Sequence, residues 1–222
     1  MNYKNLPPGK YYWDKDQIIN DEYINIDILE NLSCGTGEYW RSYRLGDTVG
    51  GKYNKKFETI EQKWPNSIKD KYMKLAFNKA NKYDILFSVI KAYPLYTFNT
   101  TNFIFIGIRV GDVMGGNILT NYVINEDYYK NLDLSKYLNK TCIICCGSHY
   151  NSNTPYTIKY VNTLYKIMKN KGFENVFVRA GNNPDDDFTL LCGSDYLIHG
   201  LGSYHKMIRN MVIEYGTKGI LN

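Results

Sequence analysis

The chain has 222 residues, and its 27 basic residues against 22 acidic ones give a formal net charge of +5. A hydrophobic fraction of 44% with a charged fraction of 22% is typical of a folded globular protein and excludes a disordered chain. The mild basic excess is spread along the sequence, so it suits a phosphate-bearing ligand without indicating the basic face of a nucleic-acid-binding protein. We find neither a signal peptide nor a run of roughly 18 apolar residues, and therefore expect a soluble, cytoplasmic protein with no membrane span.

Residues 1–95 are expected to form a mixed or helical N-terminal part. Its first half is rich in tyrosine, glycine and asparagine and has few clear signals. Between residues 57 and 92 the apolar residues recur at spacings of three and four, which predicts two helices.

Residues 96–222 alternate between short apolar runs that end in glycine-containing loops and stretches with helical spacing. This alternation predicts an α/β fold, with a Rossmann-like parallel sheet flanked by helices and ligands at the carboxyl ends of the strands. Strands and their loops are expected at 103–113, 141–149, 174–183 and 196–202, and helices at 154–172, 185–195 and 203–216.

Three cysteines lie within one predicted strand, in the run TCIICC. Cys142, Cys145 and Cys146 are interpreted as buried thiols of a reducing compartment, because neighbours in a strand point to opposite faces. A zinc site is the alternative, but tetrahedral zinc takes four ligands, and the sequence has no second Cys or His pair at metal spacing. We therefore expect no metal.

The loops after three of the predicted strands carry the residues best suited to bind an anion. Arg109 at a strand end could form two parallel hydrogen bonds to a phosphate, or could simply pair with Asp112. Gly202 and Ser203 precede a helix expected to start near Tyr204, whose free N–H groups would face an anion. The alternative interpretation is a plain strand-to-helix turn that uses glycine for its backbone freedom.

Acidic and histidine residues supply further candidates. The cluster Asp185 to Asp187 could cap a helix, bind a divalent ion or hydrogen-bond a base or sugar. His149 and His205 could each act as a general base or donate to phosphate, or could be surface or capping residues.

Five segments in a fixed order resemble fucosyltransferase-type glycosyltransferases with a His-x-Arg-Arg/Leu-Gly-Asp signature, over about residues 103–208. They are IGIRVGDV, EDYY, IICCGSH, AGNNPDDDF and YLIHGLGSYHKMI. The resemblance implies that Arg109 binds the diphosphate of a GDP-sugar, that Asp187 contacts the base, and that the loop from Gly202 to His205 holds phosphate. Gly107 stands where the family has its histidine, and Val110 stands at the second basic position, so the nucleotide stays open.

The resemblance implies a GT-B-like, metal-independent and inverting glycosyltransferase. It would transfer a sugar such as fucose from a nucleotide-sugar donor to a hydroxyl of a glycan or protein acceptor, with no other cofactor. The N-terminal part would be a reduced acceptor lobe. The expected site residues are Arg109 and His149 for catalysis, and Arg109, Asp112, Gly147, Ser148, Asp187, Gly202, Ser203 and His205 for binding the donor.

Two functions from other classes stay open. The first is a non-catalytic protein that keeps the fold and binds a nucleotide-sugar or a glycan. The second is a nucleic-acid-binding protein that uses the basic excess and its 22 tyrosines for stacking, although we expect no nucleic-acid partner.

Overall fold

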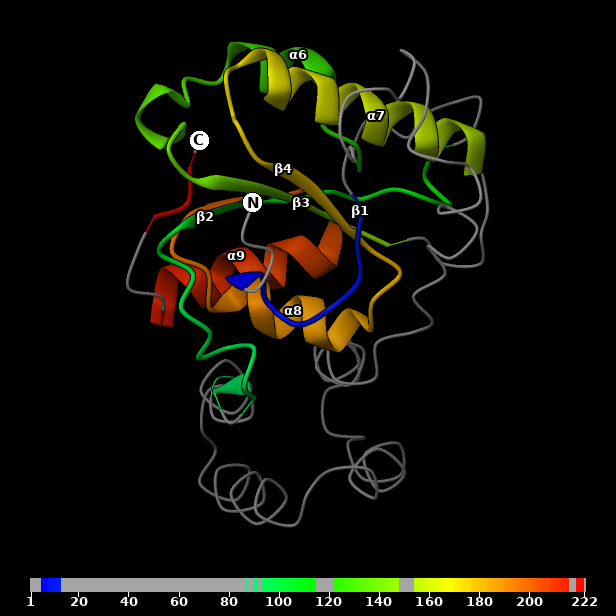
Figure 1. The fold of residues 1–222 in the computed structure, drawn as a ribbon. Coiled ribbons are helices and arrows are strands. Elements are labelled where there is room, and N and C mark those ends of the chain that lie inside the picture. Colours follow the sequence, from blue (N-terminus) through cyan, green and yellow to red (C-terminus); the bar gives the residue numbers. More distant parts are fainter. Residues whose placement is uncertain are drawn as a thin grey trace.

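A mixed sheet between two layers of helices forms the core of the protein. The computed structural model describes residues 5–12, 87, 90–91, 93–114, 122–147, 154–215 and 219–221. On one face of the sheet lie α6 (Glu126–Asn131) and α7 (Thr154–Asn170), and on the other lie α8 (Pro184–Cys192) and α9 (Gly202–Tyr215) (Figure 1). A short 3-10 helix, η3 (Ser135–Tyr137), follows α6. None of the helices in these ranges is long and apolar enough to cross a bilayer.

The sheet has five strands in the order β1-β4-β3-β2-β5. They are β1 (Tyr11–Tyr12), β2 (Phe103–Gly107), β3 (Thr141–Cys146), β4 (Val176–Ala180) and β5 (Leu197–Ile198). The last four are mutually parallel, while β1 runs antiparallel to β4. The α/β fold expected from the sequence is therefore confirmed, and the two helices expected at 57–92 fall almost wholly outside the described residues.

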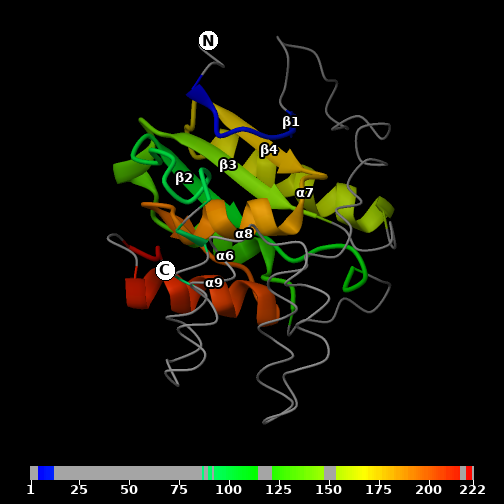
Figure 2. The same ribbon diagram turned by 90° about the horizontal axis from the view of Figure 1, so that it is seen from below.

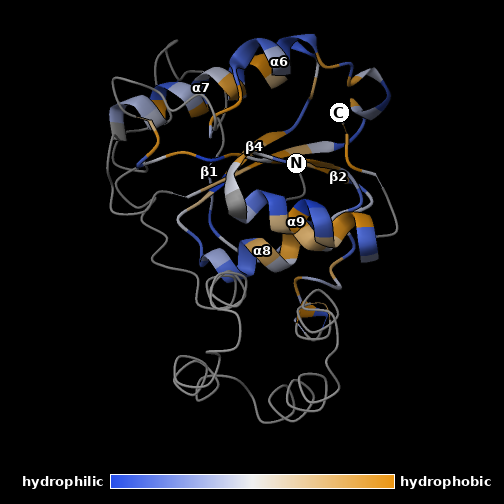
Figure 3. Ribbon diagram, turned by 180° about the vertical axis from the view of Figure 1, so that it is seen from behind, coloured by the Kyte–Doolittle hydropathy of each residue, from blue (hydrophilic) through white to orange (hydrophobic). Residues whose placement is uncertain are grey.

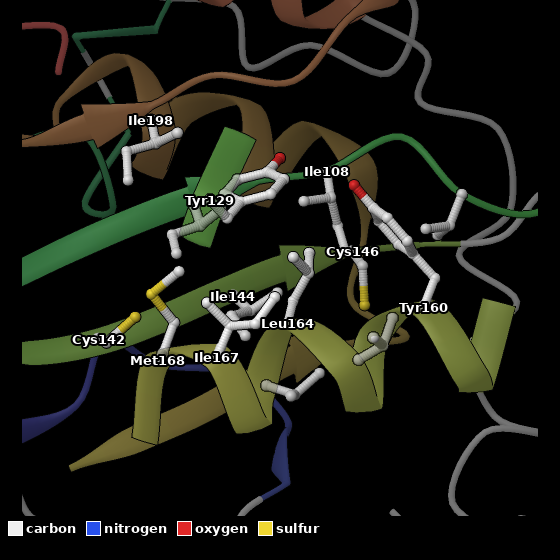
Figure 4. Close-up of a cluster of buried hydrophobic side chains, with 14 of the residues drawn as sticks. Ile108, Tyr129, Cys142, Ile144, Cys146, Tyr160, Leu164, Ile167, Met168 and Ile198 are labelled. Atoms are coloured by element: carbon white, nitrogen blue, oxygen red, sulfur yellow. The ribbon is translucent and has the colours of Figure 1, made fainter. Parts of the chain in front are cut away.

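Alternation along the central strands divides the core into two halves. In β3, Cys142, Ile144 and Cys146 belong to the cluster under α7, whereas Ile143 and Cys145 belong to the cluster under α8 and α9. The close-up in Figure 4 shows the first half, where side chains of β3 meet those of α7. Hydrophobic colours recur along the strands, and both helix layers also carry hydrophilic ones (Figure 3). The three cysteines of β3 are buried free thiols, as predicted.

Local signals at the helix ends explain where the helices begin and end. Before α8, the side chain of Asn183 accepts a hydrogen bond from the backbone N–H of Asp185 at 2.9 Å, and Pro184 occupies the first turn. The cap is thus Asn183, and the acidic residues that follow it suit the positive end of the helix. After α7, Gly172 has a φ of +103°, and the chain turns there as its Lys-Gly pair predicted.

The strand order reverses between β2 and β5. From β2 the parallel strands step through β3 to β4 on one side, and the chain then returns through α8 to place β5 on the other side of β2. Ligands of open parallel sheets bind outside the carboxyl ends of the strands at such a switch point. Figure 2, turned by 90°, shows β2, β3 and β4 side by side, with α8 and α9 on the near face. The residues that follow β2 and β5 are therefore the first place to look for a site.

The N-terminal segment reaches back onto this sheet. In register, Tyr11 of β1 lies opposite Arg179 of β4. The backbone N–H of Lys10 donates to the Asn182 side chain at 2.7 Å, and that side chain donates to the Lys10 carbonyl at 3.2 Å. Residues 5–12, which the sequence analysis placed in the N-terminal part, thus pack on the domain formed by the C-terminal half.

Candidate anion-binding site at the carboxyl edge of the sheet

An imidazole lies between the backbones that follow β2 and β5. A Cβ placed on Gly107 would lie 2.9 Å from Cδ2 and Nε2 of His205, and one on Gly200 would lie 3.1 Å from its Cε1 and Nδ1. The Gly200 position would also come 2.6 Å from the carbonyl oxygen of Gly107. A side chain at Gly200 would therefore collide with backbone, and one at Gly107 would force the His205 ring to shift.

His205 is held in one tautomer and stays neutral at pH 7. Its Nδ1 lies 3.2 Å from the carbonyl oxygen of Leu201, and since a carbonyl only accepts, Nδ1 carries the proton. Burial, with the side chain 4% exposed, lowers the pKa of His205 to about 4; the hydrogen bond to Leu201 opposes this shift, and the nearby His199 and Arg109 contribute to it. Nε2 is then an acceptor, and no described residue hydrogen-bonds to it. A neutral acceptor suits a ligand N–H or O–H better than the phosphate oxygen expected from the sequence.

Arg109 supplies the cation of the site and is paired to a carboxylate in this structure. Its Nη2 lies 2.5 Å from Oδ1 of Asp112, and its Nη1 donates to the carbonyl of Val110 at 3.3 Å. The side chains are 22% and 49% exposed, respectively. Exposed ion pairs are worth about 0–1 kcal/mol, so a ligand phosphate could displace Asp112 at little cost.

The loop that carries Arg109 is anchored from below. Gly111, whose φ is +84°, donates its N–H to Oγ1 of Thr157 on α7 at 3.1 Å. Val110 and Val113 are buried on either side of this glycine. The guanidinium therefore extends from a backbone that is held in place by α7.

Helix α9 begins at Gly202, two residues before the start near Tyr204 that the sequence suggested. Its first N–H groups have no partner within the helix and mark its positive end. Gly202 has a φ of +87°, a left-handed conformation that favours glycine. Ser203 is the second residue of α9, and its side chain lies outside the described part.

Three of the expected residues lie at or close to this edge. Gly202 starts the helix, His205 lies in its first turn and packs against Gly107, and Arg109 follows Gly107 by two residues. Gly147 directly follows β3 at the same edge and is half-buried. Ser148 and His149 lie outside the described residues, so the candidate general base has no structural description here. Within the ranges that the structure covers, no cluster of His, Cys, Asp or Glu could hold a metal ion.

Asp187 is paired with a buried arginine in this structure. Its Oδ1 accepts from Nε of Arg179 on β4 at 2.6 Å, and both side chains are buried. Nη1 of Arg179 in turn donates to the carbonyl of Pro8 at 2.8 Å and to the Tyr11 hydroxyl at 3.0 Å. Burial raises the pKa of Asp187, although the guanidinium opposes the shift. Asp187 thus links α8, β4 and the N-terminal segment.

Sequence reasoning missed three residues near this edge. His199 was not among the expected site residues, yet it is half-buried and near enough to contribute to the lowered pKa of His205. Tyr122 and Arg179 were not among the expected site residues, because neither residue belongs to a sequence motif that indicates a binding site. The one signal in the sequence is that Arg179 lies in the apolar run VFVRA. The structure buries this run along its whole length, so the charge of Arg179 is buried with it.

Comparisons of the chain with models of known protein families, with curated proteins and with solved structures find no match.

Proposed function

We propose that this edge of the sheet binds the diphosphate of a nucleotide-sugar and that the protein is a metal-independent, inverting glycosyltransferase. The observation that supports the proposal best is that His205, in the first turn of α9, packs against Gly107 at the end of β2, two residues before Arg109, at the switch point between β2 and β5. A cation with fixed geometry and a helix amino terminus are two of the devices by which proteins bind phosphate.

The same two groups suit the chemistry of sugar transfer. When the sugar leaves, negative charge develops on the departing diphosphate, and donors that are already oriented stabilise it without reorganisation. The anchored loop gives Arg109 such an orientation, since Gly111 is bonded to Thr157. Arg109 would exchange Asp112 for the diphosphate, and the first N–H groups of α9 would bind a second face of it.

His205 gives the resemblance to the glycosyltransferases a physical counterpart. Where that family has a histidine, this chain has Gly107, and the imidazole of His205 packs against Gly107 from α9. An imidazole is therefore present beside the end of β2, although another element carries it. With Nε2 as acceptor, it would receive a hydrogen bond from an N–H or O–H of the donor.

A non-catalytic protein that binds a nucleotide-sugar or a glycan is the second candidate. It is favoured by the engagement of Asp187, the residue expected to contact the base, with buried Arg179. It is also favoured by the low pKa of His205, about 4, which makes the imidazole a weak base. An ion-paired carboxylate and a weakly basic imidazole are both poor groups for activating an acceptor hydroxyl.

Calorimetric titration with GDP-, UDP- and dTDP-sugars, followed by an assay for released nucleotide in the presence of glycan and peptide acceptors, tests the proposal. Binding of at least one donor with acceptor-dependent release supports the transferase. Binding without release across the acceptor panel supports the second candidate. If none of the donors binds, the proposed site is wrong.

A further inference from the structure

Tyr122 stands beside the start of α9 with much of its ring in solvent. Its side chain is 43% exposed, and a Cβ placed on Gly202 would lie 3.5 Å from its Cδ1. The ring thus flanks bare backbone at the helix end where we propose that phosphate binds. A large apolar ring exposed at such a position is available to a ligand.

The chain is held in place directly after Tyr122. The next residue, Val123, is buried in the core under α7. The carbonyl of Ile124 accepts a hydrogen bond from the Tyr160 hydroxyl of α7 at 2.5 Å. Because the backbone is held, the ring needs little ordering when it meets a ligand, and this lowers the entropic cost of binding.

A second observation in the same place points to a ligand. His205 is 4% exposed, and its Nε2, beside Gly107, is an acceptor to which no described residue donates. An N–H or O–H of a ligand that rests on the edge between β2 and α9 would donate to this nitrogen.

The geometry points to Tyr122 as the stacking platform for the nucleobase of the ligand whose phosphates lie at Arg109 and the start of α9. This inference rests on the proposed function and specifies the nucleotide end of the ligand. Nucleobases stack on aromatic side chains with little regard to sequence, because every base has a π-face. Tyr122 therefore contributes affinity for the base, while selection among bases depends on hydrogen bonds such as one to Nε2 of His205.

The test compares Tyr122→Ala and Tyr122→Phe with the wild type, titrated with GDP, UDP and pyrophosphate. Truncation of a stacking ring weakens binding by about fivefold to a hundredfold. We expect that loss for both nucleotides in Tyr122→Ala, with pyrophosphate affinity unchanged and Tyr122→Phe like the wild type. Tyr128→Ala is the matched control, because Tyr128 is also a partly exposed tyrosine, 37% exposed, but lies on α6.

Each other outcome overturns the inference. Nucleotide affinity unchanged in Tyr122→Ala shows that the ring does not contact the base. A parallel loss for pyrophosphate shows that Tyr122 only supports the backbone of Gly202, and a loss in Tyr122→Phe assigns the effect to the hydroxyl. If the wild type binds none of the three probes, the proposed function fails, and this inference fails with it.

Discussion

The imidazole of His205 packs against Gly107 so closely that a Cβ at position 107 would lie 2.9 Å from its Cδ2 and Nε2. The contact joins the first turn of α9 to the end of β2 across 98 positions of sequence. It makes the conformation of the switch point depend on a glycine and a histidine together.

Gly107→Ala is expected to destabilise the protein by about 1–3 kcal/mol, the usual cost of forcing extra atoms into a packed site. Replacing the ring as well, in Gly107→Ala with His205→Ala, should relieve the collision, so that the double variant is more stable than the sum of the single effects implies. Denaturant unfolding of the four proteins measures the coupling. Strictly additive effects would show that the two residues do not collide.

His205 should make stability fall as the pH is lowered. Its pKa in the folded protein, about 4, lies below that of an unfolded histidine. Between about pH 6.5 and 4, His205 is therefore protonated in the unfolded chain but not in the folded protein, and this favours unfolding. On acidification from pH 7 to 4, the wild type should lose about 3 kcal/mol more than His205→Gln. Unfolding free energies at three pH values check this, and parallel pH profiles for the two proteins would contradict it.

Asp187→Asn should lower stability by about 3–5 kcal/mol, because it leaves the buried guanidinium of Arg179 without its carboxylate. Asp186→Asn is the control, since Asp186 lies in the same helical turn but is less buried, and its effect should stay within about 0.5 kcal/mol. Chemical denaturation measures both. Equal effects of the two substitutions would show that the ion pair between Asp187 and Arg179 does not stabilise the fold. Asp187 would then be a candidate for contacting a ligand.

Asp112→Asn separates the two interpretations of the residue beside Arg109. If Asp112 competes with an anion for the guanidinium, its removal should strengthen binding of pyrophosphate by up to about fivefold, the equivalent of an exposed ion pair. If Asp112 instead orients Arg109 toward the ligand, the same substitution should weaken binding. Isothermal titration of the variant and the wild type distinguishes these results by their sign.

The sheet was predictable because its strands follow from local patterns. The runs FIFIG, TCIICC and VFVRA are buried apart from the half-buried Thr141, and each ends where glycine or a polar loop interrupts it. Helix α7 ended as expected before Gly172, and α8 began at Asn183-Pro184. By contrast, the run IGIRVGDV suggested a longer strand than β2, which ends at Gly107 because Arg109 and Gly111 turn the chain toward α7.

Contacts distant in sequence decided what local patterns could not. The two residues of β1 pair with β4 across more than 160 positions, and their local sequence does not predict an edge strand. Whether Asp187 faced a ligand or a buried arginine depended on the side chain of Arg179, and whether His205 was a cation depended on its burial under Gly107 and Gly200. Of the two alternatives given for Arg109, the pairing with Asp112 is the state that the structure shows.

The most direct test of an anion site at the switch point compares Arg109→Ala with Lys130→Ala by calorimetric titration with GDP and UDP. Each substitution removes an exposed or partly exposed cation paired with an aspartate three residues away, but Lys130 lies on α6. Loss of charge-assisted hydrogen bonds should weaken nucleotide binding in Arg109→Ala by at least about tenfold, while Lys130→Ala binds like the wild type and both variants unfold near the wild-type temperature. Undiminished nucleotide affinity in Arg109→Ala would contradict the proposed site.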